Sequence, residues 1–138
     1  MLRRSLIIGL VVALVATGCS QDSDPLAVAT DLVDDWLTAW NTEDMDLLLS
    51  VFADDAVYID PNGIYTGHDE IRAHAEERFG GVWDGQRLGD GTETETGELL
   101  FTSSFESAGG TNEGDLEVEL TGDVIARFQW LGWELVSD

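Results

Sequence analysis

The period of the apolar residues changes along this chain, and that change constrains the fold more than any other feature of the sequence. One helical face, with the i, i+3, i+4, i+7 spacing, is formed by Ala29, Leu32, Val33, Trp36, Leu37 and Trp40. Residues 115–120 instead alternate between aliphatic and acidic side chains, as in a strand with one solvated face. Because helical periods come first and strand periods follow, the sequence predicts an α+β domain.

Three helices are expected in the first half. The first begins at Pro25, whose fixed φ suits the first turn of a helix. Asn41–Thr42 is expected to end it and to cap a second, shorter helix that starts at Glu43. The third spans about 69–79 and ends at Gly80–Gly81.

The expected strands are short and bounded by turns. The first, 56–60, closes in an Asp-Pro-Asn-Gly sequence of residue types that favour a β-turn. The later strands are expected at 92–96 (a polar edge strand), 99–107, 115–120, 124–130 and 133–136. Because the chain stops soon after Trp133, we expect the last strand to be truncated.

Residues 1–18 have the composition of a signal peptide. Arg3 and Arg4 precede an apolar run at 6–16, which as a helix would be about 16 Å long and too short to span a bilayer. Small residues then lead to Cys19, the only cysteine, so no intramolecular disulfide is available to it.

The segment Ala16-Thr17-Gly18-Cys19 resembles the lipobox of prokaryotic lipoproteins. The resemblance implies that Cys19 carries lipid after cleavage, and that residues 19–24 form a short linker to one domain at 25–138. The expected location is the outer face of the cell membrane, or the periplasmic side of an envelope membrane, with membrane lipid contacted through acylated Cys19.

The charge of the chain excludes several classes of partner. It has 28 Asp and Glu residues against 6 basic ones, none of them Lys, and its net charge is −22. All of the acidic residues lie beyond residue 18, so the mature part would repel nucleic acid and anionic lipid surfaces. The acidity fits a high-salt habitat, a genome that avoids lysine, or an ordinary solvated surface.

Three segments carry a resemblance to a known superfamily: WLTAWNTEDMD at 36–46, FADDAVYIDP at 52–61 and YTGHDEIR at 65–72. They resemble the nuclear transport factor 2-like superfamily, most closely its SnoaL-like and ketosteroid-isomerase-like members, over about 26–79. The resemblance implies a cone-shaped fold of three helices on a curved antiparallel β-sheet that encloses a pocket. Many relatives pair through the sheet, so a homodimer is one expectation.

The isomerase members supply a test of individual residues. Their general base matches Asp60, but their oxyanion-binding Tyr falls at Trp36. Their second hydrogen-bond donor falls near Val124, with Asp123 one residue away and therefore on the other face of a strand. Steroid-isomerase chemistry is therefore not expected here.

Asp60 and His74 are the candidate catalytic residues. A carboxylate beside an apolar pocket has a raised pKa and can move a proton to or from carbon, and His74 could assist it. The alternatives are an Asp60 that only accepts backbone N–H bonds in its turn, and a His74 at the edge of the core.

The candidate ligand-binding residues are Trp36, Trp40, Tyr58, Asp60 and His74. Tyr58 shares a strand face with Asp60, and the two tryptophans lie one helical turn apart. Ordinary core packing is the alternative for all three aromatic residues, and His68 is expected to be an exposed cap residue. The spacing of His and acidic residues indicates no metal site, and no cofactor is expected.

The sequence favours a lipid-anchored protein that binds a small, largely apolar molecule. An isomerase, cyclase or hydratase with Asp60 as general base is the first alternative, and a non-catalytic interaction module of the cell envelope is the second. A pocket filled by its own tryptophans would favour the module. An open pocket with Asp60 facing into it would favour the other two.

Overall fold

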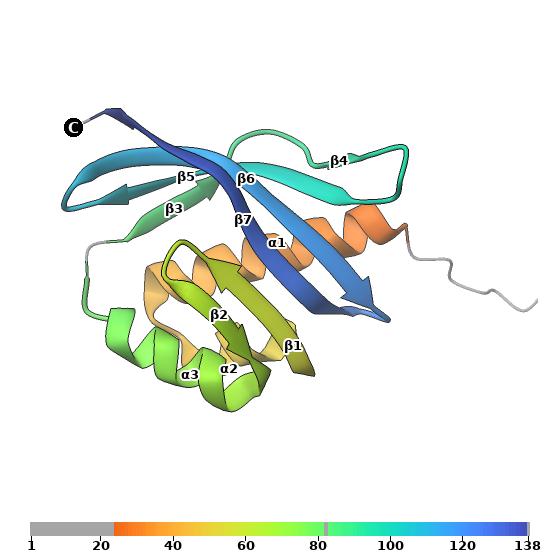
Figure 1. Ribbon diagram of the computed structural model, residues 1–138, viewed down its shortest axis with the longest axis horizontal. Helices are drawn as coiled ribbons and strands as arrows, with labels where there is room; N and C mark the ends of the chain where they lie inside the picture. The colour runs from red at the N-terminus through yellow and green to blue at the C-terminus, as the bar shows by residue number, and fades with distance from the viewer. Residues whose placement is uncertain (1–23, 82, 138) are drawn as a thin grey trace, which may run out of the picture.

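The computed structural model describes residues 24–81 and 83–137, which form three helices and one seven-stranded sheet (Figure 1). The helices are α1 (Pro25–Thr42), α2 (Met45–Ser50) and α3 (Gly67–Arg78). The strands are β1 (Phe52–Asp60), β2 (Gly63–Thr66), β3 (Asp84–Arg87), β4 (Thr92–Glu93), β5 (Leu99–Ser107), β6 (Gly110–Thr121) and β7 (Val124–Ser137). The predicted α+β class is confirmed. The predicted signal peptide and Cys19 lie outside the described residues.

The boundary between α1 and α2 differs from the prediction. α1 continues through Thr42 and ends where Glu43 adopts a left-handed conformation with a φ of 55°. Asp44 then caps α2, because its side chain accepts a hydrogen bond of 3.0 Å from the backbone N–H of Leu47. The predicted start at Glu43 was therefore wrong, since Asp44 provides the cap that we assigned to Asn41–Thr42.

Asn41 has a different role. Its Nδ2 donates to the carbonyl of Gly85 and its Oδ1 accepts from the N–H of the same residue, both at 2.8 Å. This paired contact fixes the end of α1 against β3, a short strand that the sequence did not predict. β2 was also missed, because four residues are too few to show a clear period.

The sheet runs in the order β2-β1-β7-β6-β5-β3, with β4 also beside β5. All neighbours are antiparallel except β1 and β7, which pair in parallel. The sheet is strongly curved, and the long β6–β7 ribbon crosses the molecule while α1 lies across the sheet's inner side (Figure 1). The predicted polar edge strand at 92–96 is confirmed only in its first two residues, which pair with β5.

β7 is one continuous strand of 14 residues, so the predictions of two strands and a truncated end were wrong. Gly132 has a φ of 61° and acts as a bulge, in which Gly132 and Trp133 lie opposite Gly114 of β6. In a regular strand Trp130 and Trp133 would face opposite sides. The extra residue returns both to one side, where their rings lie 4.5 Å apart.

The core lies between the helices and the inner face of the sheet. Its largest fully buried side chains include Trp36 of α1, Tyr58 of β1, Phe101 of β5 and Phe128 of β7. Trp36 is central, with its ring 4.5 Å from that of Phe128 and 5.6 Å from that of Phe105. Across 24–81 and 83–137, no helix combines the length and apolar character needed to cross a membrane.

Candidate functional site

Asp60 and His74 form a buried hydrogen-bonded pair. Asp60 is the last residue of β1, and His74 lies in the middle of α3, on its inner face. Asp60 Oδ2 lies 2.7 Å from His74 Nε2, and the two side chains are 5% and 3% exposed. The other oxygen, Oδ1, accepts backbone N–H bonds from Asn62 at 2.7 Å and Gly63 at 3.2 Å. The turn role considered for Asp60 is therefore present, and the same carboxyl also contacts His74.

The environment of Asp60 favours its ionised form. Burial by itself would raise the pKa of this carboxyl, but hydrogen bonds from His74 and from the Asn62 backbone outweigh burial and lower it below its ordinary value. The expectation of a raised pKa was therefore wrong. Because an ionised carboxylate can only accept, His74 Nε2 carries the proton in this pair.

Two tyrosines lie beside the pair. The ring of Tyr65 stacks on that of His74 with centroids 3.9 Å apart, and the ring centroid of Tyr58 lies 5.7 Å from that of His74 and 6.1 Å from that of Tyr65. Burial, followed by the charge of Asp60, raises the pKa of both phenols, so both hydroxyls remain protonated at neutral pH. The Tyr58 hydroxyl is buried and has no hydrogen-bond partner within the part of the chain that the structure describes.

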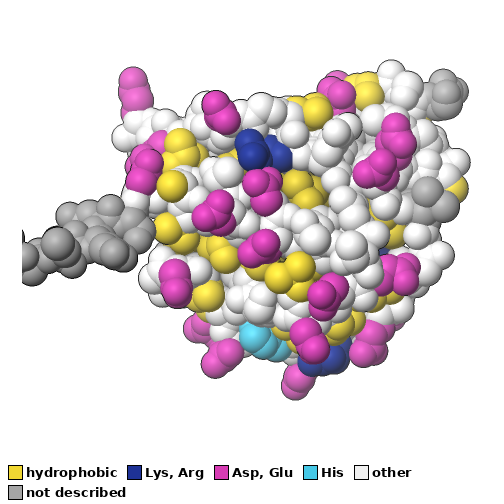
Figure 2. Space-filling model, turned by 180° about the vertical axis from the view of Figure 1, so that it is seen from behind, with side chains coloured by type: hydrophobic (Ala, Val, Ile, Leu, Met, Phe, Trp, Pro, Cys, Tyr) yellow, Lys and Arg dark blue, Asp and Glu magenta, His cyan; other side chains and the backbone are white. Residues whose placement is uncertain are grey.

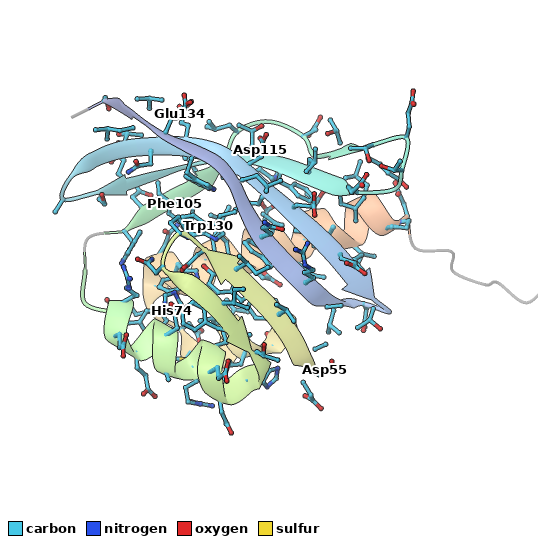
Figure 3. All side chains as sticks on the ribbon, in the orientation of Figure 1. Asp55, His74, Phe105, Asp115, Trp130 and Glu134 are labelled. Atoms are coloured by element: carbon cyan, nitrogen blue, oxygen red, sulfur yellow. The ribbon has the colours of Figure 1, made fainter. Side chains whose placement is uncertain are left out.

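A pocket of about 230 Å³ opens beside this pair; we call it the aromatic pocket. Figure 3 shows Phe105 and Trp130 of the sheet on the same side of the molecule as His74 of α3. The lining residues come from α1, α3, four strands and the loops beside them: Trp40, Tyr58, Asp60, Pro61, Asn62, His74, Arg78, Trp83, Phe105, Ser107, Asn112, Trp130 and Trp133.

The aromatic rings form a continuous wall. Phe105 and Trp130 stack with centroids 5.2 Å apart and an interplanar angle of 13°, and Trp133 extends this stack. Trp40 faces Trp83 at 5.9 Å and His74 at 6.2 Å. A flat apolar molecule would therefore meet rings on several sides.

Sequence comparison identifies the domain. The sequence model of the SnoaL-like domain family matches residues 33–129, which is more than half of the chain. This chain belongs to the SnoaL-like domain family. No curated protein matches the sequence.

Solved structures share the fold of this SnoaL-like domain at low sequence identity. A proposed polyketide cyclase from Sinorhizobium meliloti is 20% identical with a TM-score of 0.63, over 72% of this chain and 93% of that one. A ketosteroid isomerase-like protein from Catenulispora acidiphila, solved with trimethylamine, is 16% identical with a TM-score of 0.61, over 74% and 85% of the two chains. A computationally designed 17-OHP binder is 14% identical with a TM-score of 0.64, over 76% and 90%. The nuclear transport factor 2-like resemblance and the cone-shaped fold are confirmed.

The SnoaL-like fold brings together four of the five predicted ligand-binding residues. Tyr58, Asp60, His74 and Trp40 line one pocket, whereas Trp36 is fully buried behind it, 5.9 Å from Trp130 and 6.3 Å from Tyr58. His68 is half-buried rather than exposed, because its Nε2 lies 2.9 Å from the Phe52 carbonyl oxygen.

Sequence analysis missed several lining residues. Trp83, Phe105, Trp130 and Trp133 come from distant segments, and only the number of tryptophans hinted at an aromatic wall. Arg78 could have been found, because it follows His74 by four residues and therefore lies on the same helical face.

Asp123 lines a different hollow, an open groove of about 970 Å³ beside the start of α1; we call it the acidic groove. The carboxyl that lies nearest to the isomerases' second donor position is therefore absent from the aromatic pocket. Among the residues that the structure describes, no three His, Cys, Asp or Glu side chains group as metal ligands would.

Proposed function

We propose that this protein binds a small, largely apolar molecule in the aromatic pocket and is held at the outer face of a membrane by lipid on Cys19. The observation that carries the binding proposal is the open, ring-lined cavity next to the buried Asp60–His74 pair. An interaction module would have no need for such a cavity. At about 230 Å³ it lies below the roughly 300–1,000 Å³ of drug-sized sites, so the ligand is small.

The geometry favours binding over catalysis. Both oxygens of Asp60 already accept hydrogen bonds, and its pKa is lowered, which makes it a weak base toward a carbon acid. A buried, fully bonded carboxylate instead holds His74 and the 60–63 turn in place. The polar pair thus gives one wall of the pocket a fixed shape.

The binding proposal is tested with 3-phenylpropanamide, a neutral probe with an aromatic ring. Titration into the mature protein should quench tryptophan fluorescence and release measurable heat. Trp133→Ala should weaken binding about tenfold, because a ring that packs on the ligand is lost. Val28→Ala in the acidic groove is the control and should leave the affinity unchanged. Equal binding by the two variants would exclude the aromatic pocket as the site.

The anchoring proposal rests on Cys19, the sequence before it and the polar linker after it. Cells that express the protein should incorporate labelled palmitate into it and retain it in the membrane fraction. Cys19→Ala should abolish the label. Retention of the label in that variant would show that Cys19 is not the modified residue.

A proton-transfer enzyme of the isomerase, cyclase or hydratase class is the second candidate. It is favoured by one observation, the 2.7 Å contact between Asp60 and His74 at the wall of an apolar cavity. Asp60→Asn separates the two functions, because loss of turnover with retained binding of a substrate would identify an enzyme. Retained turnover in the same variant would remove Asp60 as the base.

A further inference from the structure

We infer that the aromatic pocket selects a ligand that carries a carboxylate, and that Arg78 is the residue that binds this carboxylate. The inference rests on the proposed binding function and names the ligand class: an apolar, ring-sized body with one acidic group. It follows from how the four arginines of the domain are used and from the donors and acceptors along the pocket wall.

Among the described residues that line the pocket, Arg78 is the only arginine, and none is a lysine. It is the last residue of α3, one helical turn beyond His74. Its backbone carbonyl accepts the indole N–H of Trp83 at 3.1 Å, which fixes the position of the residue at the rim. Within 24–81 and 83–137 its guanidinium makes no ion pair or hydrogen bond, so its five N–H donors are available to a ligand.

The other arginines are used differently. Arg87 binds Asp34 with Nε at 2.8 Å from Oδ1, and Arg127 lies 3.3 Å from Glu117. Arg72, like Arg78, makes no ion pair among the described residues, but it is exposed on α3 and does not line the pocket. Arg78 is therefore the arginine that combines an unpaired guanidinium with a place beside an apolar cavity. The arrangement is that of a site for an incoming anion.

The other polar side chains of the wall can both donate and accept: these are Asn62, Ser107 and Asn112. The indole N–H of Trp40 has no acceptor among the described residues. The single lining carboxylate, Asp60, is already bonded to His74 and to two backbone N–H groups. A ligand cation would meet aromatic faces but no free carboxylate, whereas a ligand anion would meet Arg78.

Because the net charge of the protein is −22, the contact with Arg78 decides whether an acidic ligand binds. The field of the whole protein repels anions, so an acid reaches this pocket only if local contacts exceed that repulsion. The apolar body supplies contact with the rings, and Arg78 supplies the contact that depends on the acidic group.

The test compares three probes with the same phenylpropyl body: 3-phenylpropionate, its neutral amide 3-phenylpropanamide and the cationic 3-phenylpropylamine. Dissociation constants are measured by calorimetry on the mature protein at neutral pH. We expect the acid to bind about tenfold more tightly than the amide, and more tightly than the amine. Arg78→Gln should remove the preference for the acid without changing the affinity for the amide, and Arg78→Lys should restore part of it.

Arg72→Gln is the matched control, since it removes one positive charge from the same helix outside the pocket. It should leave the preference intact, and circular dichroism should show all variants folded. Three results would overturn the inference alone: binding of the amide with no preference for the acid, a preference for the amine, or an equal effect of Arg78→Gln and Arg72→Gln. Failure of all three probes to bind would overturn the proposed function and the inference with it.

Discussion

Two hollows in this domain differ in both size and chemistry. The acidic groove is about four times as large as the aromatic pocket, at about 970 Å³ against about 230 Å³. The groove has an aliphatic floor that includes Leu99 and Val118, and its carboxyl groups are those of Glu93, Glu98, Glu117, Glu119 and Asp123. The pocket has aromatic walls, one bonded carboxylate and one arginine. The proposed ligand site is therefore the smaller hollow, and it differs from the larger one in the chemistry of its wall.

The two regions also differ in how their walls are supported. Trp36 is fully buried behind the pocket and contacts rings of Tyr58, Phe105, Phe128 and Trp130, whereas groove residues such as Val28 lie near the surface. Trp36→Ala should lower the free energy of unfolding by about 3–5 kcal/mol, because it leaves a large cavity. Val28→Ala should cost less than about 1 kcal/mol. Urea denaturation measures the free energy of unfolding of both variants. Comparable losses of stability would contradict the interpretation that the aromatic pocket is supported by the core.

A substitution opposite the bulge in β7 offers a second way to test the aromatic pocket separately from the acidic groove. A Cβ on Gly114 would lie 2.7 Å from the ring of Trp133 and 2.9 Å from its Cα. Gly114→Ala should therefore displace Trp133, cost about 1–3 kcal/mol in stability and weaken binding of 3-phenylpropanamide. Gly109→Ala, where the nearest atom would be 3.9 Å away, is the control. Unchanged affinity in Gly114→Ala would show that Trp133 is not a binding wall.

The acid side of the stability profile tests the role of Asp60. Since its pKa is lowered in the folded protein, it stabilises the fold at pH values above the ordinary aspartate pKa of about 3.9, and that contribution is lost as the pH falls through the lower folded value. Asp60→Asn should therefore lose stability at neutral pH and show a shallower decline in acid than the wild type. Thermal melts from pH 7 to pH 3 give both curves.

Salt should have the smallest effect. Raising the ionic strength from 0.01 M to 0.15 M shortens the screening length from about 30 Å to about 8 Å and weakens the repulsion between an acidic ligand and the domain. Binding of 3-phenylpropionate should tighten roughly two- to fivefold, while that of the neutral amide stays constant. Figure 2 shows acidic side chains spread over the back of the molecule, with basic ones only in isolated places. Weaker binding of the acid at higher salt would contradict a net repulsion between the field of the domain and the acid at this pocket.

The sequence was informative where the determinants are local. The helical period of α1, the Asp-Pro-Asn-Gly turn and the strand at 99–107 all follow from neighbouring residues, and the structure has them. The resemblance to relatives then indicated a fold in which Asp60 and His74 lie near one another. Nothing local gives the pKa of Asp60, because its direction depends on whether hydrogen bonds or burial dominate.

The sequence was less informative where strands from distant segments meet. The predicted strands 124–130 and 133–136 are one strand, in which the partner strand β6 accommodates Gly132 as a bulge because Gly114 leaves room for Trp133. The same bulge brings Trp133 to the side of Trp130. The aromatic wall therefore depends on a register that no single segment encodes.

The parallel pairing of β1 with β7 has a consequence for the order in which the protein is made. Asp60 and Tyr58 are synthesised early, but the strand that lies beside them spans 124–137 and leaves the ribosome only after residues 61–123 have been made. A nascent chain therefore has an unpaired β1 edge and half a pocket until β7 has been made. Contacts of such long sequence separation make folding slow. The pocket can therefore form only once the domain has been made, from a chain whose early segments have waited for their partner strand.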